Sequence, residues 1–236
     1  MLGLVLSCEH ASWTTPPGVD LGVAIEDLQS QAGWDHGAYE IAAQLGEALG
    51  LPVHHGAFTR MFVDLNRAAS HPDVIPAVSY GAPVPGNVAL SAQDRAARLE
   101  QFHTPYWNAV RQDCAARLLD PGRCLHLSSH SFDPDLDQHA RSFDVGVLYD
   151  PDRPFEAELA EALMFRLRGS GLSVRANQPY LGTAPALVTN LRRELGSPYY
   201  AGIEIEASHA VTYSRGGCTR IANALITTVE ALRDDG

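Results

Sequence analysis

The sequence predicts an α/β fold in which a mixed, mostly parallel β-sheet lies between two layers of helices. Short apolar segments of strand character alternate with segments whose apolar residues recur at helical spacing, along nearly the whole chain. No internal repeat or low-complexity segment interrupts this alternation. The chain has 236 residues, 45% of them hydrophobic, which is enough for one full core, so we expect a single domain over residues 1–236.

The first predicted strand begins at Leu2 and runs into His10. Proline, glycine and threonine are frequent in the two stretches that we interpret as long surface loops. Asp35 stands at an N-cap position, Gly50 follows the last apolar residue of the same helical pattern, and Pro105 predicts a bend in a second one. In chain order we expect a loop over 12–33, a helix over 35–49, short strands over 52–58 and 61–64, a loop over 70–90 that covers the site, and a helix over 91–119.

The central predicted strand covers residues 123–129 and runs into His130, shortly before Asp133-Pro134. The alternation then continues with a strand over 143–149, a helix over 154–168, a strand over 172–176, a short helix over 186–195, a strand over 199–207 and a helix over 217–233. Side chains at the carboxyl ends of strands line the crevice where open α/β sheets bind ligands. Because His10 and His130 both follow apolar strands, we expect them to share one site.

The composition excludes several classes of function. A net charge of −11 and a pI near 5.3 argue against a nucleic-acid partner. All 17 basic residues are arginine, so Schiff-base chemistry on a lysine is excluded. The four cysteines form no Cys-x-x-Cys pair, which argues against a structural zinc module or a disulfide framework. The apolar start is too short for a signal peptide or a membrane span, so we expect a soluble, cytoplasmic protein without a membrane partner.

Three residues are candidates for a metal site. Hydrolytic metal sites combine about three His, Asp or Glu ligands with an open position for water, and His10, Asp35 and His130 supply this set. Zinc held there would lower the pKa of water from ~15.7 towards ~7. Alternatively, Asp35 only caps its helix. Glu9 is a competing carboxylate, although its place next to His10 in a strand should turn it to the opposite face.

Two glutamates of the last predicted strand, Glu204 and Glu206, share one face. An unpaired buried carboxylate is costly, so one of them is a candidate general base. Two other interpretations stay open, namely an edge strand with a solvated acidic face, or an ion pair with Arg141 or Arg215.

Arg60 and Arg67 lie at the two ends of a short segment that also contains Asp64 and Asn66. Guanidinium groups suit bidentate capture of a carboxylate, so these arginines are candidates for substrate binding. We also count Arg141 among the candidates. A structural salt bridge explains such a cluster equally well, and Asp64 would then orient one of the guanidinium groups.

Taken together, these segments resemble the N-formylglutamate amidohydrolase family, in particular the branch with Cys-Glu-His-Ala-Ser after the first strand. The likeness spans nearly the whole chain, and its specificity lies in the order and spacing of many pieces. The matching pieces are Ser7-Cys-Glu-His-Ala-Ser12, Trp34-Asp-His-Gly-Ala38, Thr59-Arg60, Val63-Asp-Leu-Asn-Arg67, Val84-Pro-Gly-Asn87, Thr104-Pro-Tyr106, Ser128-Ser-His-Ser-Phe132 and Gly202-Ile-Glu-Ile-Glu206.

The resemblance implies a three-layer fold like that of the zinc carboxypeptidases, with zinc or another divalent metal as cofactor. It implies that His10 and His130 are ligands, that Asn66 with Arg67 holds a substrate carboxylate, and that Arg60 assists the developing oxyanion. The carboxypeptidase pattern has a glutamate ligand where this chain has Trp13, so the family pattern moves that ligand to Asp35. Alignment on Glu-Ala-Ser makes Glu206 the general base, which we favour, and alignment on Ile-Glu-Ile-Glu makes it Glu204.

The expected activity is therefore hydrolysis of the N-acyl amide of a small amino acid that carries a carboxylate, with N-formylglutamate as the reference substrate. The expected partner is this small molecule, and the sequence leaves the oligomeric state open. Two alternatives remain. One is a non-catalytic protein that binds an acylated amino acid, and the other is a metal hydrolase of peptide or cell-wall amides.

Overall fold

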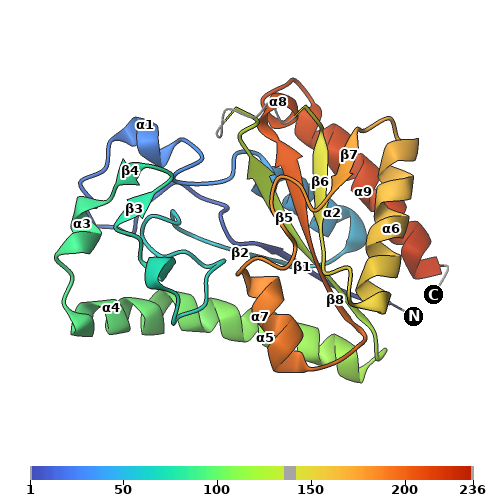
Figure 1. Ribbon diagram of the computed structural model, residues 1–236, viewed down its shortest axis with the longest axis horizontal. Helices are drawn as coiled ribbons and strands as arrows, with labels where there is room; N and C mark the ends of the chain where they lie inside the picture. The colour runs from blue at the N-terminus through green and yellow to red at the C-terminus, as the bar shows by residue number, and fades with distance from the viewer. Residues whose placement is uncertain (1, 136–141, 235–236) are drawn as a thin grey trace.

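The computed structural model describes residues 2–135 and 142–234, and these residues form a six-stranded sheet with the order β2-β1-β5-β8-β6-β7 (Figure 1). Strands β2, β1, β5 and β8 are mutually parallel, β6 is antiparallel to β8, and β7 is parallel to β6. The prediction of a mixed, mostly parallel sheet is therefore confirmed. The strands are β1 (Gly3–Cys8), β2 (Val53–His55), β5 (Cys124–Phe132), β6 (Val145–Leu148), β7 (Val174–Ala176) and β8 (Tyr200–Ser208).

Helices cover both faces of the sheet. Helices α2 (Ala38–Leu49), α6 (Pro154–Gly169) and α9 (Gly217–Asp234) pack on one face, and α5 (Thr104–Leu119) and α7 (Leu187–Leu195) pack on the other. The alternation of β1 shows why both faces need cover, because Leu4 and Leu6 join the first core while Val5 joins the second. A short helix, α8 (His209–Thr212), follows β8.

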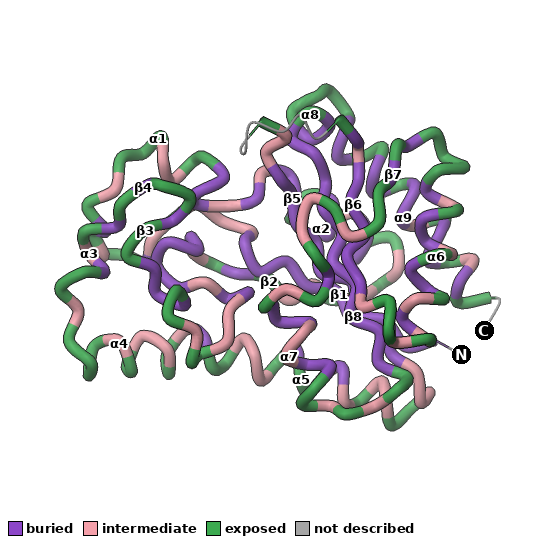
Figure 2. Tube along the Cα trace, viewed as in Figure 1, coloured by how far each residue is buried: buried purple, intermediate pink, exposed green. Residues whose placement is uncertain are grey.

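The α5 and α7 face of the sheet changes from apolar to polar along the strands. In β5, Cys124 packs against these helices, and the side chains two, four and six positions further on are those of His126, Ser128 and His130. The same alternation brings Tyr200, Glu204 and Glu206 of β8 to this face. All seven of these β5 and β8 residues are buried, as both strands are throughout their length (Figure 2), so the polar end of the face is an internal site.

The two predicted long loops pack together as a lobe beside the sheet (Figures 1 and 2). The lobe contains α1 (Ile25–Leu28), the 3₁₀ helix η1 (Pro72–Val74), β3 (Val78–Ser79), β4 (Ala82–Pro83) and α3 (Pro85–Val88). Its own hydrophobic core consists of Leu21, Ala32, Met61, Phe62, Val63, Leu65, Val74, Ile75, Ala82 and Val84. The prediction of a single domain over 1–236 stays a prediction.

Several predicted boundaries differ from the structure. The strand predicted over 61–64 is wrong, because residues 61–62 lie in a turn, residues 63–64 have no regular structure, and the apolar side chains of this stretch fill the core of the lobe. Helix α2 begins at Ala38 after Gly37, whose φ of 79° is left-handed, so Asp35 is not its N-cap. The helix predicted over 91–119 is divided into α4 (Ala92–Arg98), a π-helical turn η2 (Leu99–His103) and α5. Among the described residues, no helix is both long and apolar enough to cross a bilayer.

Candidate functional site

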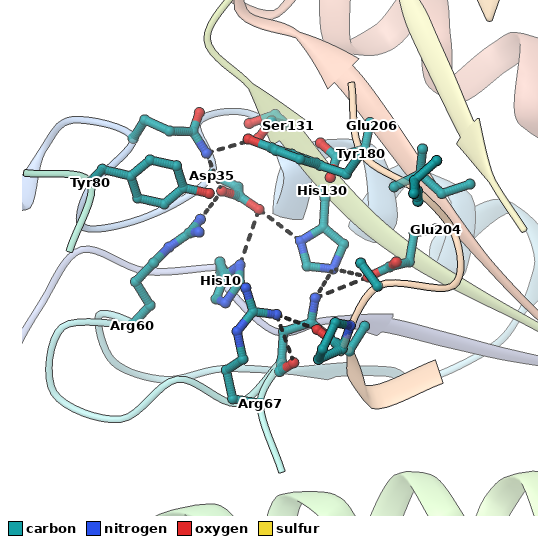
Figure 3. Close-up of a pocket in the computed structure, with 17 residues that line it drawn as sticks. His10, Asp35, Arg60, Arg67, Tyr80, His130, Ser131, Tyr180, Glu204 and Glu206 are labelled. Carbon is teal, nitrogen blue, oxygen red and sulfur yellow. Dashed lines mark hydrogen bonds and ion pairs between the residues drawn. The ribbon is translucent and has the colours of Figure 1, made fainter. Parts of the chain in front are cut away.

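The polar end of the sheet faces the lobe across a cavity of about 110 Å³ (Figure 3). His10 follows β1, His130 lies in β5, and the register of the sheet pairs His130 with Glu206 in β8. Asp35 reaches the same place because its backbone N–H donates to the carbonyl of His10 at 3.0 Å. The site therefore joins the carboxyl ends of neighbouring strands to the segment that leads into α2.

His10, Asp35 and His130 converge on one point. The Nδ1 atoms of His10 and His130 lie 3.3 and 2.8 Å from Oδ2 of Asp35. The potential ligand atoms of the three residues all lie within 4.8 Å of one another, and all three side chains are buried. The structure thus brings together the three metal-ligand candidates of the sequence.

The second carboxylate oxygen of Asp35 fixes the orientation of the first. Oδ1 accepts hydrogen bonds from Gln31 Nε2, at 2.8 Å, and from the Arg60 guanidinium. Burial raises the pKa of Asp35, but the positive charge of Arg60 and the contact with His10 outweigh it and hold this pKa well below its usual range. Asp35 is therefore a charged group whose Oδ2 is directed at the two imidazoles.

Each imidazole has a further carboxylate behind it. His10 Nε2 lies 2.8 Å from Oδ1 of Asp64, and His130 Nε2 lies 3.0 Å from Oε2 of Glu9. A carboxylate in this position holds a proton on Nε2 and leaves the Nδ1 lone pair for a metal. Two expectations are corrected here. Glu9 does not turn away from the site but contacts His130 on the side opposite Asp35, and Asp64 contacts His10 and accepts a hydrogen bond from the backbone N–H of Asn66.

The residues present fit a bound cation. Two Nδ1 atoms and a charged carboxylate oxygen face one another in a buried place, which is unfavourable unless positive charge, carried by a proton or by a cation, lies between them. Burial lowers the pKa of His130, yet the hydrogen bonds that its ring donates to the Asp35 and Glu9 carboxylates outweigh burial and raise this pKa well above its usual value. The site therefore favours positive charge at this point, and a set of two nitrogens and one oxygen suits a divalent metal.

The two glutamates of β8 have different surroundings. Each is 5% exposed on a strand between β5 and β6, so the interpretation as a solvated edge strand is wrong. Glu204 Oε1 accepts a hydrogen bond from Asn66 Nδ2 at 2.9 Å. Glu206 Oε2 has no hydrogen-bond partner within the described part of the chain, and burial raises the pKa of Glu206 to about 8. Glu206 thus lines the cavity and has one buried carboxylate oxygen that the described residues leave unpaired.

Of the predicted substrate contacts, Arg67 lies on the cavity wall, where its guanidinium also donates to the carbonyl of Pro185. The Asn66 amide is held by the protein itself, because Oδ1 accepts from the Leu187 N–H at 2.8 Å and Nδ2 donates to Glu204. Arg141 lies outside the described residues. Arg215, the other arginine considered for an ion pair with the buried glutamates, is exposed.

Sequence reasoning missed Gln31 and two aromatic residues of the wall, Tyr80 and Tyr180. Tyr80 has a left-handed φ of 46° and lies at the turn between β3 and β4, with the Arg60 guanidinium 5.5 Å from its ring centre (Figure 3). Tyr80 precedes Gly81, a turn signal that would have placed it at a loop tip. No local pattern indicates that this tip folds back over the site.

Residues 2–211 of the chain match the N-formylglutamate amidohydrolase family. The chain belongs to this family. The resemblance seen in the sequence is confirmed, and family membership supports an enzyme that hydrolyses amides. Among curated protein sequences, none matches the chain.

Solved structures similar to this member of the N-formylglutamate amidohydrolase family share its fold. Gene product Atu2144 from Agrobacterium tumefaciens has a TM-score of 0.85 and 29% identity, covering 98% of this chain and 90% of its own. N-formylglutamate amidohydrolase from Ralstonia eutropha JMP134 has a TM-score of 0.76 and 17% identity, covering 100% and 96%. A bacteriophage poly-γ-glutamate hydrolase has a TM-score of 0.51 and 10% identity, covering 99% and 86%, which shows likeness of fold alone.

Proposed function

We propose that this protein is a zinc-dependent amidohydrolase that removes the N-acyl group, in the first place N-formyl, from a small amino acid carrying a carboxylate. N-formylglutamate is the reference substrate. The observation that carries the proposal is that Glu206 lines the same cavity as His10, Asp35 and His130 and has a buried oxygen with no hydrogen-bond partner among the described residues. Family membership indicates that the bond cleaved is an amide, and the cavity of about 110 Å³ favours a small substrate over a polymer.

His10, Asp35 and His130 would hold the metal, with Asp64 and Glu9 fixing the two imidazole rings. A divalent cation in this position supplies a Lewis acid that lowers the pKa of water and polarises a carbonyl. Zinc is the first choice because nitrogen and carboxylate ligands with an open position are typical of catalytic zinc sites.

Glu206 would carry both proton transfers. It accepts a proton from the attacking water and later gives that proton to the leaving nitrogen, so one carboxylate serves as base and then as acid. A pKa raised by burial to about 8 suits this exchange, since a general acid–base group works best when its pKa is near the working pH.

Two arginines would orient the substrate and its developing charge. Arg67 on the cavity wall would bind the substrate carboxylate and so convert binding energy into orientation. Arg60 would stabilise the oxyanion, and its Nε has no hydrogen-bond acceptor among the described residues, which leaves a buried donor for this role.

The test combines metal removal with a substrate panel. Protein purified without added metal is analysed for bound metal, stripped with a chelator, and assayed against N-formyl, N-acetyl and N-succinyl amino acids before and after Zn²⁺ is restored. We expect activity to disappear with the metal and to return with it, with N-formyl acidic amino acids preferred. Full activity of the stripped protein would overturn the mechanism, and tight binding without cleavage would instead indicate the non-catalytic binding protein.

Arg67→Ala should raise KM about 10–100-fold and change kcat much less. The reason is that a hydrogen bond to a charged group contributes about 1.5–3 kcal/mol to binding. The measurement is steady-state kinetics on the best substrate of the panel. Arg67→Lys serves as a control that keeps the positive charge and loses the bidentate guanidinium, so its KM should lie between those of the wild type and Arg67→Ala. An unchanged KM in Arg67→Ala would show that the role of Arg67 is its bond to the Pro185 carbonyl.

A further inference from the structure

The long helical segment over 92–119 contains a π-helical turn, η2 (Leu99–His103), next to the candidate site. His103 is the last residue of this turn, and Tyr106 and Trp107 follow it in α5. We propose that these three side chains form a bracket that positions the metal ligands and the substrate-binding segment. The bracket has two arms, one through Glu9 and one through the backbone of the 64–67 segment. The proposal rests on the metal site of the proposed function and assigns no reacting group.

The first arm runs from α5 to His130. The Tyr106 hydroxyl donates to Oε1 of Glu9 at 2.8 Å, and Oε2 of Glu9 lies 3.0 Å from Nε2 of His130. Ser128 also donates to Glu9, so both carboxylate oxygens are held. Glu9 is fully buried, and a buried carboxylate without these donors would be costly. Tyr106 therefore sets the place of Glu9, and Glu9 sets the plane of the His130 ring.

The second arm runs from the same face of the helix to the segment that carries Asp64, Asn66 and Arg67. Nε2 of His103 lies 2.7 Å from the carbonyl oxygen of Arg67, and Trp107 Nε1 donates to the carbonyl of Leu65 at 2.8 Å. Burial lowers the pKa of His103, so the neutral ring donates its Nε2–H. The two rings stack with centres 4.9 Å apart, which fixes both donors.

The π-turn explains how one helix face makes all these contacts. Residues 103, 106 and 107 are spaced i, i+3 and i+4, so they lie on one face of α5. Arg98, just before the turn, and Phe102, within it, contact Phe62 of the lobe. One extra residue in a helical turn changes the phase of everything that follows by about 100°. Without the π-turn, the residues that hold the lobe and those that hold the site would diverge around the helix.

The test uses Tyr106→Phe and Trp107→Phe, each of which removes one donor. Metal affinity is measured with Co²⁺ as probe by competition with a chelator, together with the visible spectrum of bound Co²⁺. Amide hydrogen exchange is measured at Asp64, Asn66 and Arg67 in the metal-free protein. Both readouts use the metal or the protein alone, so they give the same answer whether or not the protein cleaves any substrate of the panel.

We expect the two variants to separate the two arms. Tyr106→Phe should weaken Co²⁺ binding about tenfold and shift the spectrum, because outer partners of metal ligands contribute about 10–100-fold to affinity. Trp107→Phe should speed exchange in the 64–67 segment roughly fivefold and weaken Co²⁺ binding less than Tyr106→Phe does, because Trp107 reaches a metal ligand only through the backbone that carries Asp64. Tyr200→Phe is the matched control, because it removes a buried hydroxyl bonded to His126 at 2.9 Å rather than to Glu9.

Two results would overturn the bracket. One is an unchanged Co²⁺ affinity and spectrum in Tyr106→Phe. The other is equal loss in Tyr106→Phe and Tyr200→Phe, which would show that any buried hydroxyl of this region acts through stability alone.

Discussion

Glu206→Gln is expected to lower kcat/KM by about 10²–10⁴-fold while the metal affinity stays nearly unchanged. Glutamine keeps the size of the side chain and loses the ability to accept and return a proton, and general acid–base catalysis contributes about this factor. The uncommitted Oε2 and the pKa raised by burial to about 8 are the reasons for choosing Glu206. Steady-state kinetics with the best substrate of the panel, and metal titration of the same variant, measure the two quantities.

Glu204→Gln is the matched control, since the two residues lie on the same face of β8 and are equally buried at 5% exposure. Glu204 accepts a hydrogen bond from Asn66, so Glu204→Gln should disturb the 64–67 segment and lower kcat much less than Glu206→Gln does. If Glu204→Gln instead abolished turnover and Glu206→Gln remained active, the general base would be Glu204. Equal activity of both variants and the wild type would exclude a glutamate base on this strand.

His130→Ala is expected to lose stoichiometric zinc and all measurable activity while the protein remains folded. His130 supplies one of three ligand atoms that lie within 4.8 Å, and two ligands hold a divalent metal far more weakly than three. The substitution also leaves Glu9 without its imidazole partner, so some loss of thermal stability is expected. Metal analysis, activity and circular dichroism on the same preparation check the three parts.

Ser129→Ala is the control for this change. Ser129 immediately precedes His130 in β5, but its hydroxyl donates to the carbonyl of Ala38 in α2, on the opposite face of the sheet. The Ser129→Ala protein should keep zinc and activity. A His130→Ala protein that retained one zinc per chain and normal turnover would contradict the proposed metal site, and an unfolded His130→Ala protein would direct the same test to His130→Gln.

Local patterns in the sequence were sufficient to predict most strands of the sheet. The predicted strands at 123–129 and 199–207 correspond to β5 and β8, and the predicted helices at 154–168 and 217–233 correspond to α6 and α9, with ends that differ by a few residues. Apolar periodicity is a local property of the sequence, so it predicts strands and helices without knowledge of the fold. The strand predicted over 61–64 failed because an apolar run in a lobe looks the same as an apolar run in a sheet.

Where the sequence left alternative roles for a residue of the candidate site, tertiary contacts were needed to choose between them. Alternation in β8 places Glu204 and Glu206 on one face, but only packing shows that Asn66 donates to Glu204 and that, within the described part of the chain, one oxygen of Glu206 has no partner. Similarly, the position of Asp35 ahead of a helix suggested a cap, and its contacts with His10 and His130 appear only once the chain is folded.

The sequence by itself determined the fold class, the family, and the two strands that end in histidine, because these depend on residue type, spacing and order along the chain. The tertiary structure alone decided which carboxylate faces which imidazole, and that Tyr106 and Trp107 of α5 reach Glu9 and Leu65. The physical reason is that burial and hydrogen bonding depend on neighbours far apart in the chain. Pro105 predicted a bend in this helical segment, but it did not predict that the bend is a π-turn that aligns α5 with those neighbours.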